Sequence, residues 1–137
     1  MSESQADTIL IVDDDPDVVF AVTAMLESSG FQVIAANTGL EALEKVRLDK
    51  PDLILLDLMI EGHDTGFQVA KALKGDPATR HIPIIMVSAV QQRTGFGFQQ
   101  DRDGHWMKTD AFMEKPYEPK TVLAKIKELL SSTPAER

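Results

Sequence analysis

The chain has 137 residues, 43% hydrophobic and 26% charged, which predicts one globular domain over residues 1–137 with its core at about 8–130. A formal net charge of −8 argues against direct nucleic-acid binding, which depends on Lys and Arg neutralising phosphates. The sequence has no cysteine, no long apolar run and no signal-type N-terminus, which excludes disulfides and predicts a cytoplasmic protein without a membrane segment.

The first half of the chain predicts strand, helix, strand and helix in turn. Thr8–Val12 is a nearly continuous apolar run, typical of a strand buried on both faces of a parallel sheet. A helix follows, with Asp15 as its N-cap and Pro16 at its first position, and Gly30 ends it. The next strand is predicted at Phe31–Ala35. The inner stripes of the two helices are Val18, Val22, Met25 and Leu26, and then Leu40, Leu43 and Val46.

The second half repeats this alternation. Asp52–Leu56 and Ile82–Val87 predict two buried strands, and Ala111–Glu114 predicts a short fifth one. Two helices are predicted, one with Phe67, Ala70 and Leu73 on its inner side, and one that begins at Pro119 with Val122, Leu123, Ile126, Leu129 and Leu130. The polar termini, residues 1–7 and 131–137, are expected to fray. Alternation of this kind predicts a doubly wound α/β sandwich with right-handed crossovers.

Gln91–Asp110 departs from the alternation. A helix should join the fourth and fifth strands here, yet the segment contains three glycines, Gly95, Gly97 and Gly104. Each glycine costs a helix up to about 1 kcal/mol relative to alanine. We therefore expect an irregular fourth helix.

Acidic and polar residues follow the predicted strands. They are Asp13, Asp14 and Asp15 after the first strand, Asp57 after the third, Ser88 after the fourth and Lys115 after the fifth. In open α/β sheets, ligands bind outside the carboxyl ends of the strands. A set of oxygen ligands with one lysine suits Mg²⁺ or Mn²⁺. A carboxylate that becomes phosphorylated beside such an ion forms a coherent phosphoryl-transfer site.

Each of these signals has a plainer explanation. Asp15 before Pro16 is better explained as an N-cap than as a ligand, so it is left out of the site. A single aspartate at the end of a strand is commonly a cap or turn residue. Lys115 before Pro116 is compatible with a surface lysine at the start of a loop. The combination of compatible residues at four strand ends is what favours a site.

Four segments carry a family resemblance, which runs from Thr8 to Leu130. I-L-I-V-D-D-D-P-D, P-D-L-I-L-L-D-L-M, I-P-I-I-M-V-S-A and F-M-E-K-P resemble the four signature segments of response-regulator receiver domains, of the single-domain, chemotaxis-regulator-like type. The resemblance implies a flavodoxin-like fold: a five-stranded parallel sheet in the order 2-1-3-4-5 with helices on both faces.

The resemblance also implies a phosphorelay function. A histidine kinase or phosphotransfer protein would donate a phosphoryl group to Asp57, with Mg²⁺ bound by Asp57 itself, by Asp14 directly and by Asp13 through water. The backbone carbonyl of Met59 would be a further ligand. The protein would not be an enzyme beyond self-catalysed phosphoryl transfer and slow self-dephosphorylation.

The remaining implied roles concern binding of the phosphoryl group and switching. Ser88 would hydrogen-bond the phosphoryl group, Lys115 would pair with it, and the small Ala89 would leave it room. Ser88 and Phe112 would form a two-state switch, although Phe112 is equally compatible with an ordinary core aromatic. The output would reach an unknown protein partner through the face made by the fourth helix, the fifth strand and the fifth helix.

Three features differ from the family pattern. Glu61 stands where the family commonly has proline, and Gly66 comes one residue late, which predicts a longer and more acidic loop over the site. Met59 and Val90 are apolar at positions that influence the lifetime of the phosphoryl group, which predicts slow self-dephosphorylation. The aromatic residues of the irregular segment either cover the sheet or form a docking patch: Phe96, Phe98 and Trp106.

Two other functions are open at this point. One is a pseudo-receiver, an interaction module of the same fold that does not depend on phosphate. The other is an Asp-nucleophile phosphatase, which would place a second acid where this chain has Met59. The stretch after Ser131 is too short for an output domain, so we expect signalling through protein contacts.

Overall fold

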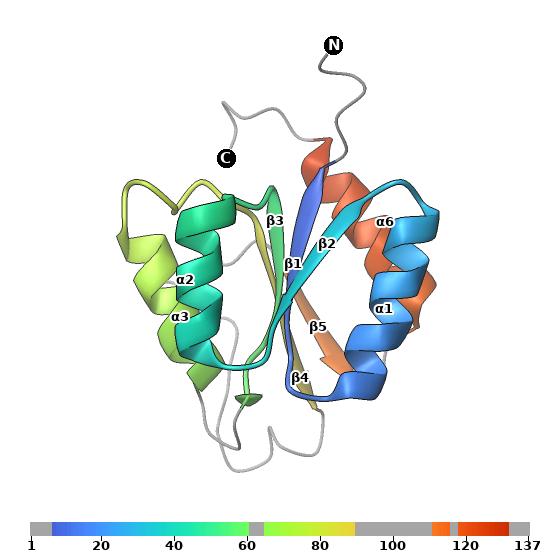
Figure 1. Ribbon diagram of the computed structural model, residues 1–137, viewed down its shortest axis with the longest axis horizontal. Coiled ribbons are helices and arrows are strands. Elements are labelled where there is room, and N and C mark those ends of the chain that lie inside the picture. The colour runs from blue at the N-terminus through green and yellow to red at the C-terminus, as the bar shows by residue number, and fades with distance from the viewer. Residues whose placement is uncertain (1–6, 61–64, 90–110, 116–117, 132–137) are drawn as a thin grey trace.

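The computed structural model describes residues 7–60, 65–89, 111–115 and 118–131, apart from the side chains of Ala89 and Lys115. Within these ranges the chain forms one parallel sheet of five strands in the order β2-β1-β3-β4-β5 (Figure 1). The strands are β1 (Thr8–Val12), β2 (Gln32–Ala36), β3 (Leu53–Asp57), β4 (Ile84–Ala89) and β5 (Ala111–Lys115). The helices are α1 (Pro16–Ser28), α2 (Gly39–Asp49), α3 (Thr65–Gly75) and α6 (Pro119–Leu130). The predicted fold class and strand order are confirmed.

The sheet is buried on both faces. Helices α2 and α3 cover one face, and α1 and α6 cover the other (Figure 1). Along β1, Leu10 and Val12 belong to the core under α2 and α3, whereas Ile9 and Ile11 belong to the core under α1 and α6. Because both sets of side chains are buried, a continuous apolar run was the right signal for this strand.

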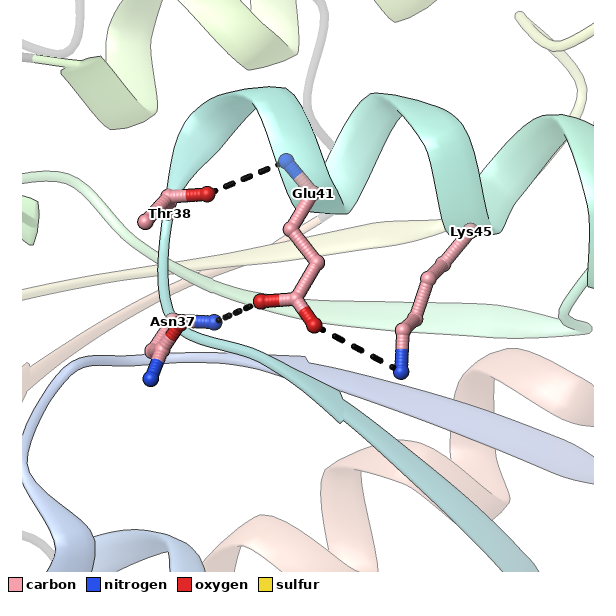
Figure 2. A network of polar contacts seen from close by, with 4 residues as sticks. All are labelled: Asn37, Thr38, Glu41 and Lys45. Carbon is pink, nitrogen blue, oxygen red and sulfur yellow. Dashed lines mark hydrogen bonds and ion pairs between the residues drawn. The ribbon is translucent and has the colours of Figure 1, made fainter.

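Side-chain caps fix where two helices begin. Asp15 caps α1 as predicted, since its Oδ1 accepts a hydrogen bond from the Asp17 N–H at 3.0 Å. At α2, the Thr38 Oγ1 accepts from the Glu41 N–H at 3.1 Å (Figure 2). Glu41 in turn accepts from the Asn37 N–H at 3.1 Å, one residue before the cap. Thr-x-x-Glu is the sequence signature of a capping box, so the start of α2 could have been predicted from it.

The inner face of α2 was predicted correctly at Val46 and Leu43 but incorrectly at Leu40. Leu40 was placed on the inner stripe, but it is 79% exposed. The buried residues of α2 are Gly39, Ala42 and Val46. The helix begins at Gly39 and packs through small residues, which a search for large apolar side chains does not detect.

Strand boundaries moved by one or two residues. β4 was expected at Ile82–Val87 and instead begins at Ile84, because Pro83 has no N–H to donate to a ladder. β4 ends at Ala89, so Ser88 lies within the strand rather than after it. The expected irregular segment Gln91–Asp110 lies outside the described residues. None of the helices in the described ranges has the length and apolar character needed to cross a bilayer.

Candidate functional site

Three carboxylates meet at the carboxyl ends of β1 and β3. The two strands are parallel neighbours with Val12 in register with Leu56, so the residues that follow, Asp13 and Asp57, arrive side by side. One carboxylate oxygen from each of Asp13, Asp14 and Asp57 lies within 4.8 Å of the other two. The structure thus brings together the three acidic residues to which the sequence analysis assigned metal binding.

The carboxylates differ in exposure and in local hydrogen bonding. Asp13 and Asp57 are buried, with exposed fractions of 4% and 7%, whereas Asp14 is exposed. The Asp13 Oδ1 accepts from the Asp15 N–H at 2.9 Å, and the Asp57 Oδ1 accepts from the Met59 N–H at 3.1 Å. Each bond orients a carboxylate through the turn that follows its own strand.

Crowding of these charges favours a bound cation. Two carboxylates no more than 4.8 Å apart repel by about 3 kcal/mol at an effective dielectric constant near 20. A divalent cation with oxygen ligands would remove this repulsion. The donor set, three carboxylates at one edge of the sheet, fits Mg²⁺ better than a metal that prefers nitrogen or sulfur ligands.

The strand register brings two more predicted site residues to the same edge. Ser88 is 1% exposed and lies one residue beyond Val87, the residue paired with Asp57. Lys115 ends β5 in register with Ala89. The side chains of Lys115 and Ala89 lie outside the described part of the chain.

Phe112 and Met59 lie on one face of the sheet. Both are partly buried and pack against the core under α2 and α3. Phe112 is in register with Met86 on β4, a residue of the same core. Glu61 and Val90, the other positions that departed from the family pattern, lie outside the described residues.

Gly66, in the first turn of α3, packs directly against the backbone that follows Asp57. Its N–H donates to the Leu58 carbonyl at 2.9 Å. A Cβ at this position would lie 2.5 Å from the Leu58 Cα and 2.7 Å from the Leu58 oxygen, and closer still to the Asp57 carbonyl oxygen. Only a glycine fits here, and the sequence analysis had noted Gly66 for its spacing alone.

A hollow of about 660 Å³ lies beside the acidic cluster. Asp13 and Asp14 line it together with Phe20 of α1 and Glu41 of α2. Phe20 is 76% exposed, an unusual position for a large aromatic side chain. The sequence analysis singled out neither Phe20 nor Glu41. A signal existed for Phe20, since it falls outside the inner stripe of its helix.

Comparison with known proteins agrees with this geometry. Residues 9–127 match the family described as the response regulator receiver domain. The chain belongs to this family. Receiver domains are signalling modules of two-component systems, generally without enzymatic activity, and they interact with histidine kinases and downstream effectors.

Individual relatives agree with the assignment. The receiver domain is 36% identical over 126 residues to protein PilH of Pseudomonas aeruginosa, covering 90% of this chain and 97% of PilH. It spans only about half the length of other curated relatives. Its structure resembles a CheY-like receiver domain protein from Methanospirillum hungatei, with a TM-score of 0.79, 26% identity, and 97% and 100% of the two chains covered.

One further solved structure shares the fold at lower identity. It is the receiver domain of sensor histidine kinase PA1611 from Pseudomonas aeruginosa, with a TM-score of 0.77, 21% identity, and 93% and 100% of the two chains covered. That structure has a magnesium ion coordinated in its active-site cleft.

Proposed function

We propose that Asp57 accepts a phosphoryl group from a histidine kinase or phosphotransfer protein, and that the receiver domain then signals through protein contacts. The observation that carries this proposal is the cluster of Asp13, Asp14 and Asp57 at the carboxyl ends of adjacent strands. A buried, oriented carboxylate beside two further acids has the arrangement that metal-assisted phosphoryl transfer requires. A pseudo-receiver would have no need to keep three like charges within 4.8 Å.

The metal would be Mg²⁺, or Mn²⁺ in its place. Asp14 and Asp57 would bind it directly, Asp13 through water, and the backbone carbonyl of Met59 would add a further oxygen. When bound, the ion neutralises negative charge on the phosphoryl oxygens during transfer. Support comes from the oxygen-only donor set and from the magnesium ion in the cleft of the PA1611 receiver domain.

The transfer itself would be a displacement at phosphorus. A carboxylate oxygen of Asp57 forms the new bond to phosphorus, and the bond between phosphorus and the imidazole nitrogen of the donor breaks. Backbone hydrogen bonding to Asp57 holds the nucleophile in one orientation, which lowers the entropic cost of the step. Lys115 would pair with the negative charge that remains, and Ser88 would hydrogen-bond a phosphoryl oxygen.

Phosphorylation would be read out by a switch. Movement of Ser88 toward the phosphoryl group would vacate space that the Phe112 ring enters. Partial burial of Phe112 against the core under α2 and α3 is compatible with this role. The altered surface would be formed by β5, α6 and the expected fourth helix, whose residues lie outside the described part of the chain, and it would bind a downstream protein.

Acetyl phosphate with Mg²⁺ tests the central claim. Intact mass spectrometry should show a mass gain of one phosphoryl group that needs Mg²⁺ and disappears in Asp57→Asn. Asp52→Asn is the matched control, because Asp52 directly precedes the same strand at its opposite end, where it accepts a hydrogen bond from the Thr8 N–H. Retained phosphorylation in Asp57→Asn would mean that another residue is the acceptor, and no Mg²⁺-dependent gain in the unmodified protein would favour the pseudo-receiver.

The phosphoryl group should be long-lived once formed. Met59 is apolar and partly buried beside Asp57, so it offers no group to position an attacking water. We expect Met59→Asn to shorten the lifetime of the phosphoryl group. A half-life of seconds for the unmodified protein in Mg²⁺ would contradict this expectation.

Phe20 suggests where the protein donor docks. It is exposed at the rim of the hollow that Asp13 and Asp14 also line, so a partner seated there would bury an aromatic ring next to the acceptor. Phe20→Asp should slow transfer from a phosphohistidine protein but leave phosphorylation by acetyl phosphate unchanged. Equal loss with both donors would mean that the substitution damages the site itself.

A further inference from the structure

A second hollow lies at the opposite end of the sheet. It measures about 540 Å³ and opens between the C-terminal ends of α2 and α3 and the segments that lead into β3 and β4. Its accessible apolar wall includes the half-buried Leu43 and the exposed Ala72 and Ala78, above the buried Val46 and Ile82. A volume of this size suits a small organic molecule. The acidic cluster lies at the other ends of the same strands, so this hollow is separate from it.

Hydrogen bonds within the protein fix the part of the wall that is formed by α3 and the loop after it. The Lys74 Nζ donates to the carbonyls of Arg80 and Ile82 at 3.0 and 2.9 Å, and the Thr79 Oγ1 donates to the Leu73 carbonyl at 2.7 Å. These bonds tie the loop after α3 back to its own helix. The hollow therefore exists before any ligand arrives, which lowers the cost of binding.

The charged and titratable side chains around the hollow differ in how they are hydrogen-bonded within the protein. They are Arg47, Lys50, Asp52, Asp76 and His81. Both carboxylates already accept a backbone N–H, at 2.8 and 2.9 Å. Among the residues that the structure describes, none forms a hydrogen bond or ion pair with the side chains of Arg47, Lys50 or His81. The exposed donors of Arg47, Lys50 and His81 are thus available to an anionic group on the ligand.

Lys50 places a basic side chain at this rim although its backbone conformation is unfavourable for a non-glycine residue. It is the C-cap of α2 with φ 49° and ψ 63°, in the left-handed region, where glycine is the usual residue. Among the described residues, Lys50 is the only non-glycine residue with a positive φ. Glycine would relieve the strain but remove the cation, so a ligand that needs the cation explains the residue present.

We propose that this hollow binds a small organic acid with an aromatic or branched apolar body and one carboxylate. The apolar body lies against Leu43, Ala72 and Ala78, and the carboxylate faces Arg47 and Lys50. Guanidinium binds a carboxylate through two parallel hydrogen bonds, and this geometry distinguishes the acid from a neutral analogue of the same shape. The proposal does not depend on phosphorylation of Asp57.

Naphthoate and its neutral amide are suitable probes. Titration of 2-naphthoate into ¹⁵N-labelled protein should give saturable shifts of amides around Ala72 and Ala78, with Kd about millimolar or tighter. 2-Naphthamide should bind about tenfold more weakly, because it lacks the charge. Equal affinity for the two probes would overturn the proposal, as would shifts centred on Asp13 and Asp57.

Three variants sharpen the test. Arg47→Gln should weaken naphthoate binding about tenfold, and Ala72→Leu should abolish it by filling the hollow. Lys50→Gly should raise the melting temperature and yet weaken binding about fivefold. If Arg47 and Lys50 serve only to complement the helix C-terminus, Arg47→Gln and Lys50→Gly bind naphthoate as the unmodified protein does, and the proposal fails. Lys125→Gln on α6 is the control and should leave the affinity unchanged.

Discussion

Replacing Gly66 by alanine tests whether α3 must lie in contact with the strand that carries Asp57. The added Cβ would lie 2.5 Å from the Leu58 Cα, whereas real contacts of this kind stay above 3.0 Å, so the first turn of α3 must move by at least about 0.5 Å. Overpacking of this kind costs about 1–3 kcal/mol. Weakening of the Gly66 N–H bond to the Leu58 carbonyl adds about 0.5–1.5 kcal/mol. The higher helix propensity of alanine offsets up to about 1 kcal/mol of this, which leaves a net loss between about 0.5 and 4.5 kcal/mol.

Gly75→Ala is the matched control in the same helix. A Cβ at Gly75 would meet nothing within 4 Å, and Gly75 does not have a positive φ. Urea unfolding followed by circular dichroism should therefore show a loss for Gly66→Ala and no loss for Gly75→Ala. Gly66→Ala should also slow phosphorylation by acetyl phosphate, by up to about a hundredfold if the acceptor shifts by an ångström. Equal stability of the two variants would refute the packing argument.

Three further predictions concern stability. Thr38→Ala removes the cap of α2 and should lower the free energy of unfolding by about 1 kcal/mol in urea, whereas Thr38→Ser should retain most of it. Lys74→Met removes two hydrogen bonds to loop carbonyls and should cost about 1–3 kcal/mol in the same assay, with faster proteolysis of the loop after α3. Burial raises the pKa of Asp7, and repulsion from Asp52 raises it further, so the stability associated with the protonated form is lost as pH rises through the folded-state pKa. Asp7→Asn should consequently raise the free energy of unfolding at pH 7 by less than about 0.5 kcal/mol, seen as a slightly higher melting temperature. Near about pH 3 the substitution should leave the melting temperature unchanged.

Most of the fold was predictable because it depends on apolar periodicity. Continuous aliphatic runs marked β1, β3 and β4, and Asp15 with Pro16 marked the start of α1. Two errors have physical causes. Leu40 looked like a core residue, but α2 packs through Gly39 and Ala42, and small side chains carry little periodic signal. The start of β4 depended on Pro83, whose missing N–H delays the ladder.

The site was predictable in composition but not in packing. Topology alone requires residues after adjacent parallel strands to meet, so Asp13 and Asp57 could be paired from the sequence. The close approach of Gly66 depends on how α3 docks, and spacing along the chain does not encode that distance. The exposed position of Phe20, in contrast, was predictable, since this residue falls outside the apolar stripe of α1. The roles of Ser88, Lys115 and Phe112 stay predictions.

The central position of β3 has a consequence for amide exchange. This strand lies between β1 and β4, with all five of its residues buried, so its amides should open only with global unfolding. Asp57 thus ends a central strand that is buried along its whole length. A modification there cannot be accommodated by loosening the strand itself. Changes in deuterium uptake should instead appear in the segments beyond the carboxyl ends, such as residues 58–60 and the first turn of α3, while β3 remains protected.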